Sequence, residues 1–204
     1  MAKAGISTRL IRFVDTCVGH RKGGIANVCI IVACFFGAIS GSGPATVAAL
    51  GAVLIPAMVE RGGFSAAFST ALMATSSSIA IVIPPSIAFV VYASITGVSI
   101  GDMFMAGIIP GILMGLALVV VVMLEVRRNH VVPSNVEKAS AKERWNAFKD
   151  AFWGFLMPVI ILGGIYGGIF TPTEAAAVSV VYGLFVGMII YKEVKFKRPV
   201  GNSD

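Results

Sequence analysis

The five residues Ser40-Gly41-Ser42-Gly43-Pro44 interrupt a long apolar stretch that covers residues 24–60. The apolar segment on each side is shorter than the about 20 residues that a helix needs to cross roughly 30 Å of hydrocarbon. Proline fits the first turn of a helix, so Pro44 suits the start of the returning segment. Two short helices joined at a Gly/Ser/Pro tip therefore predict a re-entrant hairpin over residues 24–60.

Both ends of the predicted hairpin are basic. Arg21 and Lys22 precede it, and Arg61 follows it. Because Lys and Arg collect in the cytoplasmic loops of membrane proteins, this pattern places both ends on the cytoplasmic side. The hairpin then enters the membrane and returns without crossing it.

The composition of the whole chain is that of a membrane protein. Of the 204 residues, 57% are hydrophobic and 13% are charged, whereas soluble domains carry about 25% charged residues. The charges are also segregated. Five long stretches contain no Asp, Glu, Lys or Arg: residues 24–59, 62–101, 103–124, 151–173 and 175–191. We therefore predict an all-α polytopic membrane protein.

A second interruption lies in the apolar stretch over residues 64–98. This stretch is too long for one plain helix, and it contains Thr75-Ser76-Ser77-Ser78 and then Pro84-Pro85. Proline removes a backbone donor and clashes with the preceding turn, and the residue before it leaves the helical region. We predict a helix that breaks near residues 81–85 and crosses the membrane once.

The remaining segments complete the predicted domain organisation. Residues 103–124 form a span in which Gly107, Gly111 and Gly115 allow close helix packing. Together with the hairpin and the broken helix, this span makes up half of a transport domain over residues 24–126. The other units are an interfacial amphipathic helix (1–23), a cytoplasmic connector with a second interfacial helix (127–150), a scaffold helical pair (151–191) and a basic tail (192–204).

The loops on the side opposite to the basic segments cover residues 96–102 and 170–174. Neither loop contains Lys or Arg, and each carries one acid, Asp102 or Glu174. The net charge of +6 therefore reflects basic loops on the cytoplasmic side, and we expect no nucleic-acid partner. Glu174 opens a helix, where capping is its simplest role. The three cysteines fit no metal-ligand spacing, so we expect no transition metal and no cofactor.

The two interruptions are the places where a ligand is expected. Non-helical backbone at membrane depth is tolerated only where it is buried in protein or lines a cavity. Interrupted helices leave carbonyls for cations, and helix N-termini favour anions. The N-terminus of the returning helix near Ala45 suits an anionic substrate. The candidate oxygens for a hard cation such as sodium are the hydroxyls of Ser40, Ser42, Thr46, Ser76, Ser77 and Ser78 and the carbonyls of Gly41 and Ile83.

Other functions stay open at this point. The breaks are also compatible with a non-transporting scaffold subunit, in which they serve packing alone. An ion-coupled carrier that works without a binding protein is a further alternative. Gly41-Ser42-Gly43 resembles part of a serine-nucleophile turn, but His20 and His130 lie in basic loops, so no base is expected at membrane depth. We therefore predict that the chain is not an enzyme.

Several motifs resemble, in order, those of the large membrane subunit of TRAP transporters (DctM-like), and the resemblance covers nearly the whole chain. They are ISGSGPATVAALG (39–51), LIPAM (54–58), IPPSI (83–87), GVSIG (97–101), AGIIPG (106–111), PVIILGG (158–164) and GIFTPTEAAA (168–177).

The resemblance implies an elevator-type, sodium-coupled importer of organic anions in the bacterial inner membrane. Its substrates would be carboxylates such as C4-dicarboxylates, keto acids or sialic acid. Its partners would be a periplasmic substrate-binding protein, a small TRAP membrane subunit and the lipid bilayer. By similarity, sodium would bind between the hairpin tip and the break, at Ser40, Gly41, Ser42, Ala45, Ser78, Ile83 and Pro84. Substrate would contact Gly43, Pro44, Thr46 and Ser86.

The resemblance also predicts that this chain alone does not transport. Subunits of this family are about twice as long and contain two inverted repeats, and this chain matches the first. We expect proteoliposomes that contain only this chain to show no concentrative uptake of an organic anion under an inward sodium gradient. Sodium-dependent accumulation by the lone chain would contradict the prediction.

Overall fold

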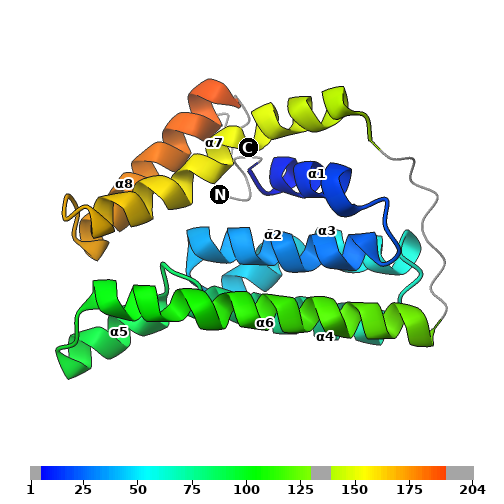
Figure 1. The fold of residues 1–204 in the computed structure, drawn as a ribbon. Coiled ribbons are helices and arrows are strands. Elements are labelled where there is room, and N and C mark those ends of the chain that lie inside the picture. Colours follow the sequence, from blue (N-terminus) through cyan, green and yellow to red (C-terminus); the bar gives the residue numbers. More distant parts are fainter. Residues whose placement is uncertain (1–5, 130–138, 192–204) are drawn as a thin grey trace, which may run out of the picture.

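The computed structural model describes residues 6–129 and 139–191. Within these residues the chain folds into α-helices and one π-helical turn, without a strand (Figure 1). The helices are α1 (Ile6–Val18), α2 (Gly24–Ser40), α3 (Gly43–Glu60), α4 (Ala66–Val82), α5 (Ile87–Thr96), α6 (Ile100–Arg128), α7 (Ala141–Tyr166) and α8 (Pro172–Phe185), followed by the π-helical turn η2 (Val186–Ile190).

The helices confirm the predicted fold class. Five helical segments in the described part of the chain are long and apolar enough to cross a membrane, and α2 is a shorter apolar helix. The membrane-length segments are Gly43–Glu60, Ala66–Thr96, Ile100–Arg128, Ala141–Tyr166 and Pro172–Ile190.

The α2–α3 hairpin forms where the sequence predicted it. α2 begins after Gly23 and ends before Gly41, and both glycines have a left-handed backbone, with φ of 70° and 62°. Pro44 stands in the first turn of α3, as predicted. The two ends of the hairpin lie close together, because a Cβ on Gly62 would come 2.5 Å from Ile25 Cγ2.

The core of the molecule surrounds α2. This helix is apolar on all sides, which is typical of a buried helix. Val28, Cys29 and Val32 of α2 are fully buried, together with Leu50 of α3 and Met73 of α4. α2 has 17 residues and packs against α3, α4 and α6. Because these helices enclose it, its C-terminal end has a fixed position among them.

The predicted break separates α4 from α5. Residues 83–86 lie between the two helices, with Ile83 and Ser86 in extended conformation. The predicted glycine row of α6 makes close contacts, and two of its members, Gly107 and Gly111, lie against this break. A Cβ on Gly107 would overlap the carbonyl oxygen of Val82, and a Cβ on Gly111 would overlap the side chain of Ile83. The break therefore sits against the middle part of α6, the longest helix described.

One helix replaces two predicted units. The sequence predicts an interfacial helix that ends at residue 150 and a scaffold helix that begins at residue 151, whereas α7 runs without interruption from Ala141 to Tyr166. No Gly or Pro stands between residues 141 and 153 to end a helix at the expected boundary, and Gly154 and Pro158 lie within α7. The capping box of Ser140 and Glu143 starts α7.

α1 runs alongside α2 (Figure 1) and contacts α7 through aromatic rings. The ring of Phe13 lies 5.6 Å from Phe148 and 5.4 Å from Phe155, measured between centroids. The predicted location of α1 at the membrane interface stays a prediction. The basic tail over residues 192–204 lies outside the described residues.

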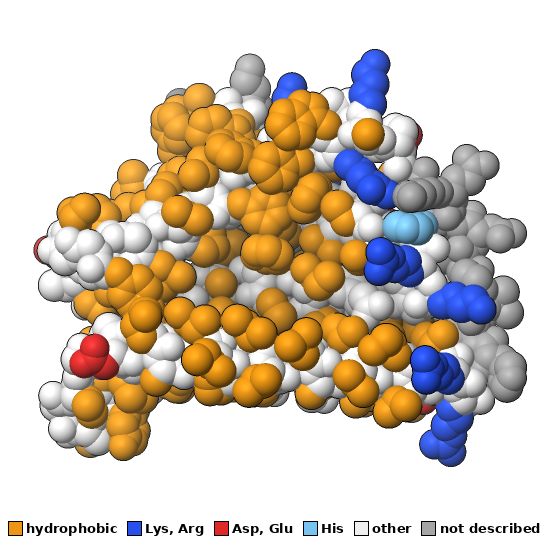
Figure 2. All heavy atoms as spheres, in the orientation of Figure 1, with side chains coloured by type: hydrophobic (Ala, Val, Ile, Leu, Met, Phe, Trp, Pro, Cys, Tyr) orange, Lys and Arg blue, Asp and Glu red, His pale blue; other side chains and the backbone are white. Residues whose placement is uncertain are grey.

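The surface has the distribution of charge expected from the topology. Figure 2 shows the Lys and Arg side chains at one end and along the upper edge of the molecule, and hydrophobic side chains over the length of α6. The turn between α5 and α6, which precedes Asp102, lies at the opposite end of α6 (Figure 1). Large apolar side chains of α6 are exposed, including Ile109 at 70%. Such a surface suits contact with lipid or with other membrane helices.

The packing of α6 on the break yields a testable prediction. We expect Gly107→Ala to lower the free energy of unfolding by about 1–3 kcal/mol, because the added methyl group overlaps backbone. Gly163→Ala is the matched control, since a Cβ there meets nothing within 4 Å and Ala favours a helix by roughly 0.5–1 kcal/mol over Gly. Thermal unfolding in detergent measures both variants. Equal effects of the two substitutions would contradict this packing.

Candidate functional site

The hairpin tip is held by a network of hydroxyl and carbonyl groups. Ser40 Oγ lies 3.1 Å from Thr46 Oγ1 and donates to the Ser42 carbonyl at 3.3 Å. The Thr46 hydroxyl donates to the same carbonyl at 2.9 Å. Ser42 caps α3, its side chain accepting from the N–H of Ala45. The tip therefore gathers three hydroxyls and at least one backbone carbonyl within a single turn.

The break between α4 and α5 is held by Ser86. Its buried hydroxyl donates to the carbonyl of Ile81 at the end of α4 and accepts from the N–H of Phe89 at the start of α5. The Pro84-Pro85 peptide bond is cis. Because both prolines lack an N–H, Ser86 supplies hydrogen bonds that a continuous helix would have made through its backbone.

The tip and the break contact each other directly. The N–H of Ile87, the first residue of α5, donates to the carbonyl of Gly41 at 3.4 Å. A Cβ on Gly41 would lie 2.6 Å from the carbonyl oxygen of Pro85. Close approach and a left-handed backbone at φ 62° both favour glycine at this position. The C-terminal end of α2 therefore meets the N-terminal end of α5, where their opposite helix dipoles attract.

A cavity of about 480 Å³ opens beside this contact. One wall consists of the hairpin tip and the start of α5, and the facing wall belongs to α7 and α8. The polar side chains of the lining are Ser40, Ser86, Thr173 and Ser179, and the lining contains no charged residue. Among the described residues, this cavity combines uncharged hydroxyl groups with a mainly apolar wall, an arrangement typical of small-molecule sites.

The structure brings part of the predicted site together. Ser40, Gly41 and Ser86 line the cavity. Gly43 lies against α4, because a Cβ there would come 3.2 Å from the carbonyl oxygen of Ser77. Thr46 is fully buried and stabilises the tip through its hydrogen bond to the Ser42 carbonyl.

Other predicted residues fall outside the cavity lining. Pro44 and Ala45 are exposed at the start of α3. Pro84 is buried, and the side chain of Ile83 faces α6. Ser78 is partly buried. Its hydroxyl donates to the carbonyl of Ala74, one turn earlier in α4, at 3.4 Å. The ligand roles assigned to all of these residues remain predictions.

The wall formed by α7 and α8 was not predicted as part of the site. Thr173 and Ser179 contribute hydroxyls, and the small side chains of Ala175 and Ala176 form the part of the wall between them. Glu174 is not part of the lining, and it accepts from the N–H of Thr171 at 2.8 Å in a capping box. The sequence feature that could have indicated this wall is a pair of hydroxyl residues in a mainly apolar segment. Such a pair is equally common where helices only pack against each other.

Comparison with known proteins identifies the family. A model of the DctM component of tripartite ATP-independent periplasmic (TRAP) transporters matches residues 1–201. The chain belongs to the DctM family. DctM relatives are permease subunits of transporters, and the five membrane-length segments agree with a multi-pass protein of the bacterial inner membrane.

Three relatives illustrate the similarity. The C4-dicarboxylate TRAP transporter large permease protein of Pseudomonas aeruginosa is 45% identical over 198 residues, covering 97% of this chain and 46% of that protein. The ectoine TRAP transporter large permease protein of Halomonas elongata is 45% identical over 197 residues, 96% of this chain and 45% of that protein. The isethionate TRAP transporter permease protein of Oleidesulfovibrio alaskensis is 46% identical over 194 residues, 95% of this chain and 30% of that protein.

This DctM chain thus spans less than half the length of the relatives that it matches. The cavity described above is formed within that span, between the hairpin tip, the break and the α7–α8 pair.

The hydroxyl network at the tip yields a testable prediction. We expect Thr46→Val to lower the free energy of unfolding by about 1–3 kcal/mol, because Ser40 Oγ loses a buried partner and the Ser42 carbonyl loses a donor. Thr70→Val is the matched control, since Thr70 is exposed and its hydroxyl bonds only its own helix at Ala66. The control should change stability by less than about 0.5 kcal/mol. Chemical unfolding in detergent measures the free energy of unfolding of both variants. If Thr46→Val lowers it no more than Thr70→Val does, the network does not stabilise the tip.

Proposed function

We propose that this chain is the hairpin-bearing first part of the large permease of a TRAP transporter that imports organic anions with sodium. The observation that carries the proposal is the direct contact of two interrupted helices, the tip at Gly41 and the break at Pro85 to Ile87, beside a cavity of about 480 Å³. Discontinuous helices that meet at membrane depth are the usual ion and substrate sites of secondary transporters.

The chemistry of the tip suits a hard monovalent cation. Sodium binds oxygen ligands, and neutral hydroxyl and carbonyl oxygens suffice because its charge is small. Ser40 Oγ faces both the tip network and the cavity, and the Gly41 carbonyl lies at the same place. Each carbonyl oxygen carries two lone pairs, so the Gly41 carbonyl keeps one for an ion while it accepts from Ile87. Sodium therefore binds where α2 ends and α5 begins.

The anion is expected in the neighbouring cavity. The N-terminus of α5 points toward it, and Ser86 at that N-terminus is part of the lining. Backbone N–H groups at a helix start attract negative charge. The hydroxyl of Thr173 on the opposite wall can donate a further hydrogen bond to a carboxylate, whereas the hydroxyl of Ser179 donates to the carbonyl of Ala176 at 2.7 Å. Because the lining carries no Lys or Arg, the bound sodium supplies the positive charge that the anion needs, which couples the two ligands.

The packing of the helices suits an elevator movement. One hydrophobic cluster is built around α2 and includes buried residues of α1, α3, α4 and α6. A second cluster has its buried residues in α7 and α8, at Met157, Ile161 and Ala175. The two clusters have separate buried residues and touch through partly buried side chains, Phe155 of α7 against the first cluster and Ile39 of α2 against the second. In the proposed movement these contacts break while the buried residues of each cluster stay together. The cavity lies along the surface between them.

Substrate and partners follow from the family. Relatives are named for C4-dicarboxylate, isethionate and ectoine, and we propose a small carboxylate or related organic anion for this chain. A periplasmic binding protein delivers it, and a small membrane subunit supports the scaffold. Uptake that proceeds without a soluble receptor would instead favour an independent ion-coupled carrier.

The proposal is tested first by sodium binding. We expect the melting temperature of the purified protein to rise in sodium chloride relative to choline chloride at equal ionic strength. A ligand that binds only the folded state stabilises it by about 2.7 kcal/mol at a hundredfold excess over Kd. Ser42→Leu should abolish the rise, because a bulky side chain fills the tip beside Ser40.

Ser65→Leu serves as the matched control. Ser65 also caps a helix, α4, but it lies at the opposite end of that helix from the break. This variant should keep the sodium-dependent rise. If sodium and choline give the same melting temperature for this chain, both alone and after addition of the second half of a DctM permease as a separate chain, the breaks serve packing, and the scaffold alternative replaces the transporter.

A further inference from the structure

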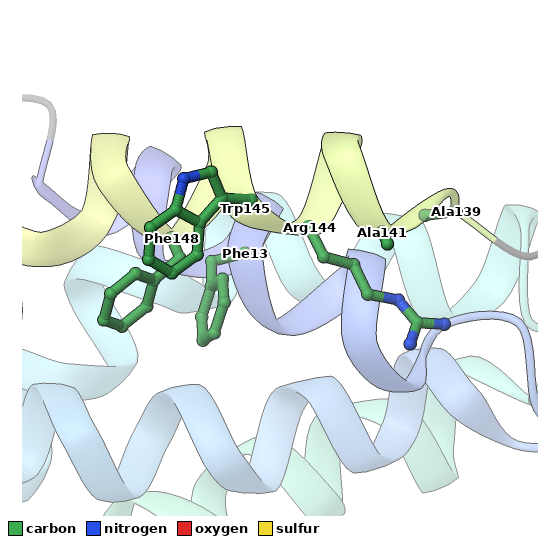
Figure 3. A pocket seen from close by; sticks show the side chains of 6 residues that line it. All are labelled: Phe13, Ala139, Ala141, Arg144, Trp145 and Phe148. Carbon is green, nitrogen blue, oxygen red and sulfur yellow. The ribbon is translucent and has the colours of Figure 1, made fainter.

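A second pocket, of about 550 Å³, lies between α1 and the start of α7. Figure 3 shows the rings of Phe13, Trp145 and Phe148 gathered on one side of it, while Arg144 extends from α7 into the space toward α1. The lining is completed by Ala139 and Ala141, so Arg144 is the single charged residue among the described lining. This pocket is separate from the tip and the break, and the proposed transport function does not use it.

Two nitrogens of the Arg144 guanidinium group lack hydrogen-bond partners among the residues that the structure describes. Its Nε and Nη2 atoms are shielded from solvent and make no hydrogen bond within the described part of the chain. No ion pair of Arg144 is found within the described residues: Glu143, the preceding residue, accepts from the N–H of Ser140 at 2.7 Å, and Oδ2 of Asp15 on α1 pairs with Arg61 at 3.0 Å. Buried donors without a partner are rare, because each one costs the free energy of removing it from water. The arrangement therefore favours an anion that is brought by a ligand.

The aromatic wall indicates what else the ligand carries. The rings of Trp145 and Phe148 stack with centroids 5.7 Å apart, and Phe13 lies 5.6 Å from Phe148. Trp145 is 58% exposed. A small hydrated anion gains nothing from such a surface, whereas an alkyl chain is stabilised by it. The ligand should therefore combine an anionic head with an apolar chain.

The position of the pocket supplies the source of such a ligand. α7 follows the basic connector, and α1 carries Arg9 and Arg12, so the pocket belongs to the cytoplasmic side. The cytoplasmic leaflet carries anionic lipids, and basic pockets between helices on this side bind their head groups. Tryptophan is also enriched at the level of the head groups.

We propose that this pocket binds an anionic phospholipid of the cytoplasmic leaflet. The phosphate accepts hydrogen bonds from Arg144, and an acyl chain lies against Phe13, Trp145 and Phe148. The lipid then links α1 to α7, two helices that belong to different predicted units of the chain. Its binding does not depend on sodium or on the transported anion.

The test compares lipids with the same acyl chains and different head groups. The delipidated protein in detergent is titrated with phosphatidylglycerol or phosphatidylcholine, and the melting temperature is recorded. We expect phosphatidylglycerol to raise the melting temperature more than phosphatidylcholine. Arg144→Gln should weaken the apparent affinity for phosphatidylglycerol about tenfold or more, as expected for a lost charge-assisted hydrogen bond. Lys142→Gln is the matched control, because it removes the same charge from an exposed position of the same helix, and it should retain the affinity.

Three outcomes would overturn the proposal: equal shifts with the two lipids, an unchanged affinity in Arg144→Gln, or the full shift with glycerol phosphate alone. The last result would mean that the pocket takes a soluble anion. If Arg144→Gln does not fold, Trp145 fluorescence decides, with Trp153→Phe removing the second tryptophan. Brominated phosphatidylglycerol should quench Trp145 more strongly than brominated phosphatidylcholine, and equal quenching would refute the site.

Discussion

Backbone polar groups at membrane depth need partners, and this fold depends on how its two interrupted helices supply them to each other. The Gly41 carbonyl at the end of α2 accepts from Ile87 N–H at the start of α5. Hydrocarbon offers no water for such groups, so neither interruption is stable without the other or a comparable partner. The close approach depends on Gly41, whose missing side chain leaves room for the Pro85 carbonyl. Because the contact is made by backbone, it fixes the tip and the break at one depth while leaving hydroxyls and carbonyls for ligands.

The surrounding helices hold this contact in place. Most of α2 is buried, and Gly107 and Gly111 of α6 let the break lie directly against α6. α7 and α8 have a small core of their own and supply only one wall of the cavity. A rigid unit that carries the tip and the break therefore faces a separate pair of helices across a cavity with hydroxyls on both sides. This division of the packing, more than any single residue, makes movement of a bound anion past α7 and α8 physically reasonable.

The sequence was most informative where local chemistry decides the structure. The Gly/Ser/Pro run at residues 40–44 and the pair Pro84-Pro85 concentrate helix-breaking residues, so the hairpin and the broken helix were predicted within a few residues. Single prolines are weaker signals, since Pro110 and Pro158 stand inside α6 and α7. Tertiary placement was harder to predict. The wall at Thr173 and Ser179 was missed, because the sequence does not record which helices become neighbours. The packing of the Ile83 side chain on α6 was not predicted either, and the predicted role of the Ile83 carbonyl as a ligand stays a prediction. The boundary expected at residue 150 followed a change in polarity, and a helix continues through such a change when no residue breaks it.

The central claim is that the tip and the break together form one cation site. Peptide-level hydrogen exchange of the protein in detergent tests it most directly, with sodium chloride compared with choline chloride at equal ionic strength. Sodium should slow exchange by a common factor in the peptides that contain the tip, residues 40–46, and the break, residues 83–89. Peptides from the second half of α6 should not change. Protection of only one of the two segments, or of neither, would contradict the claim.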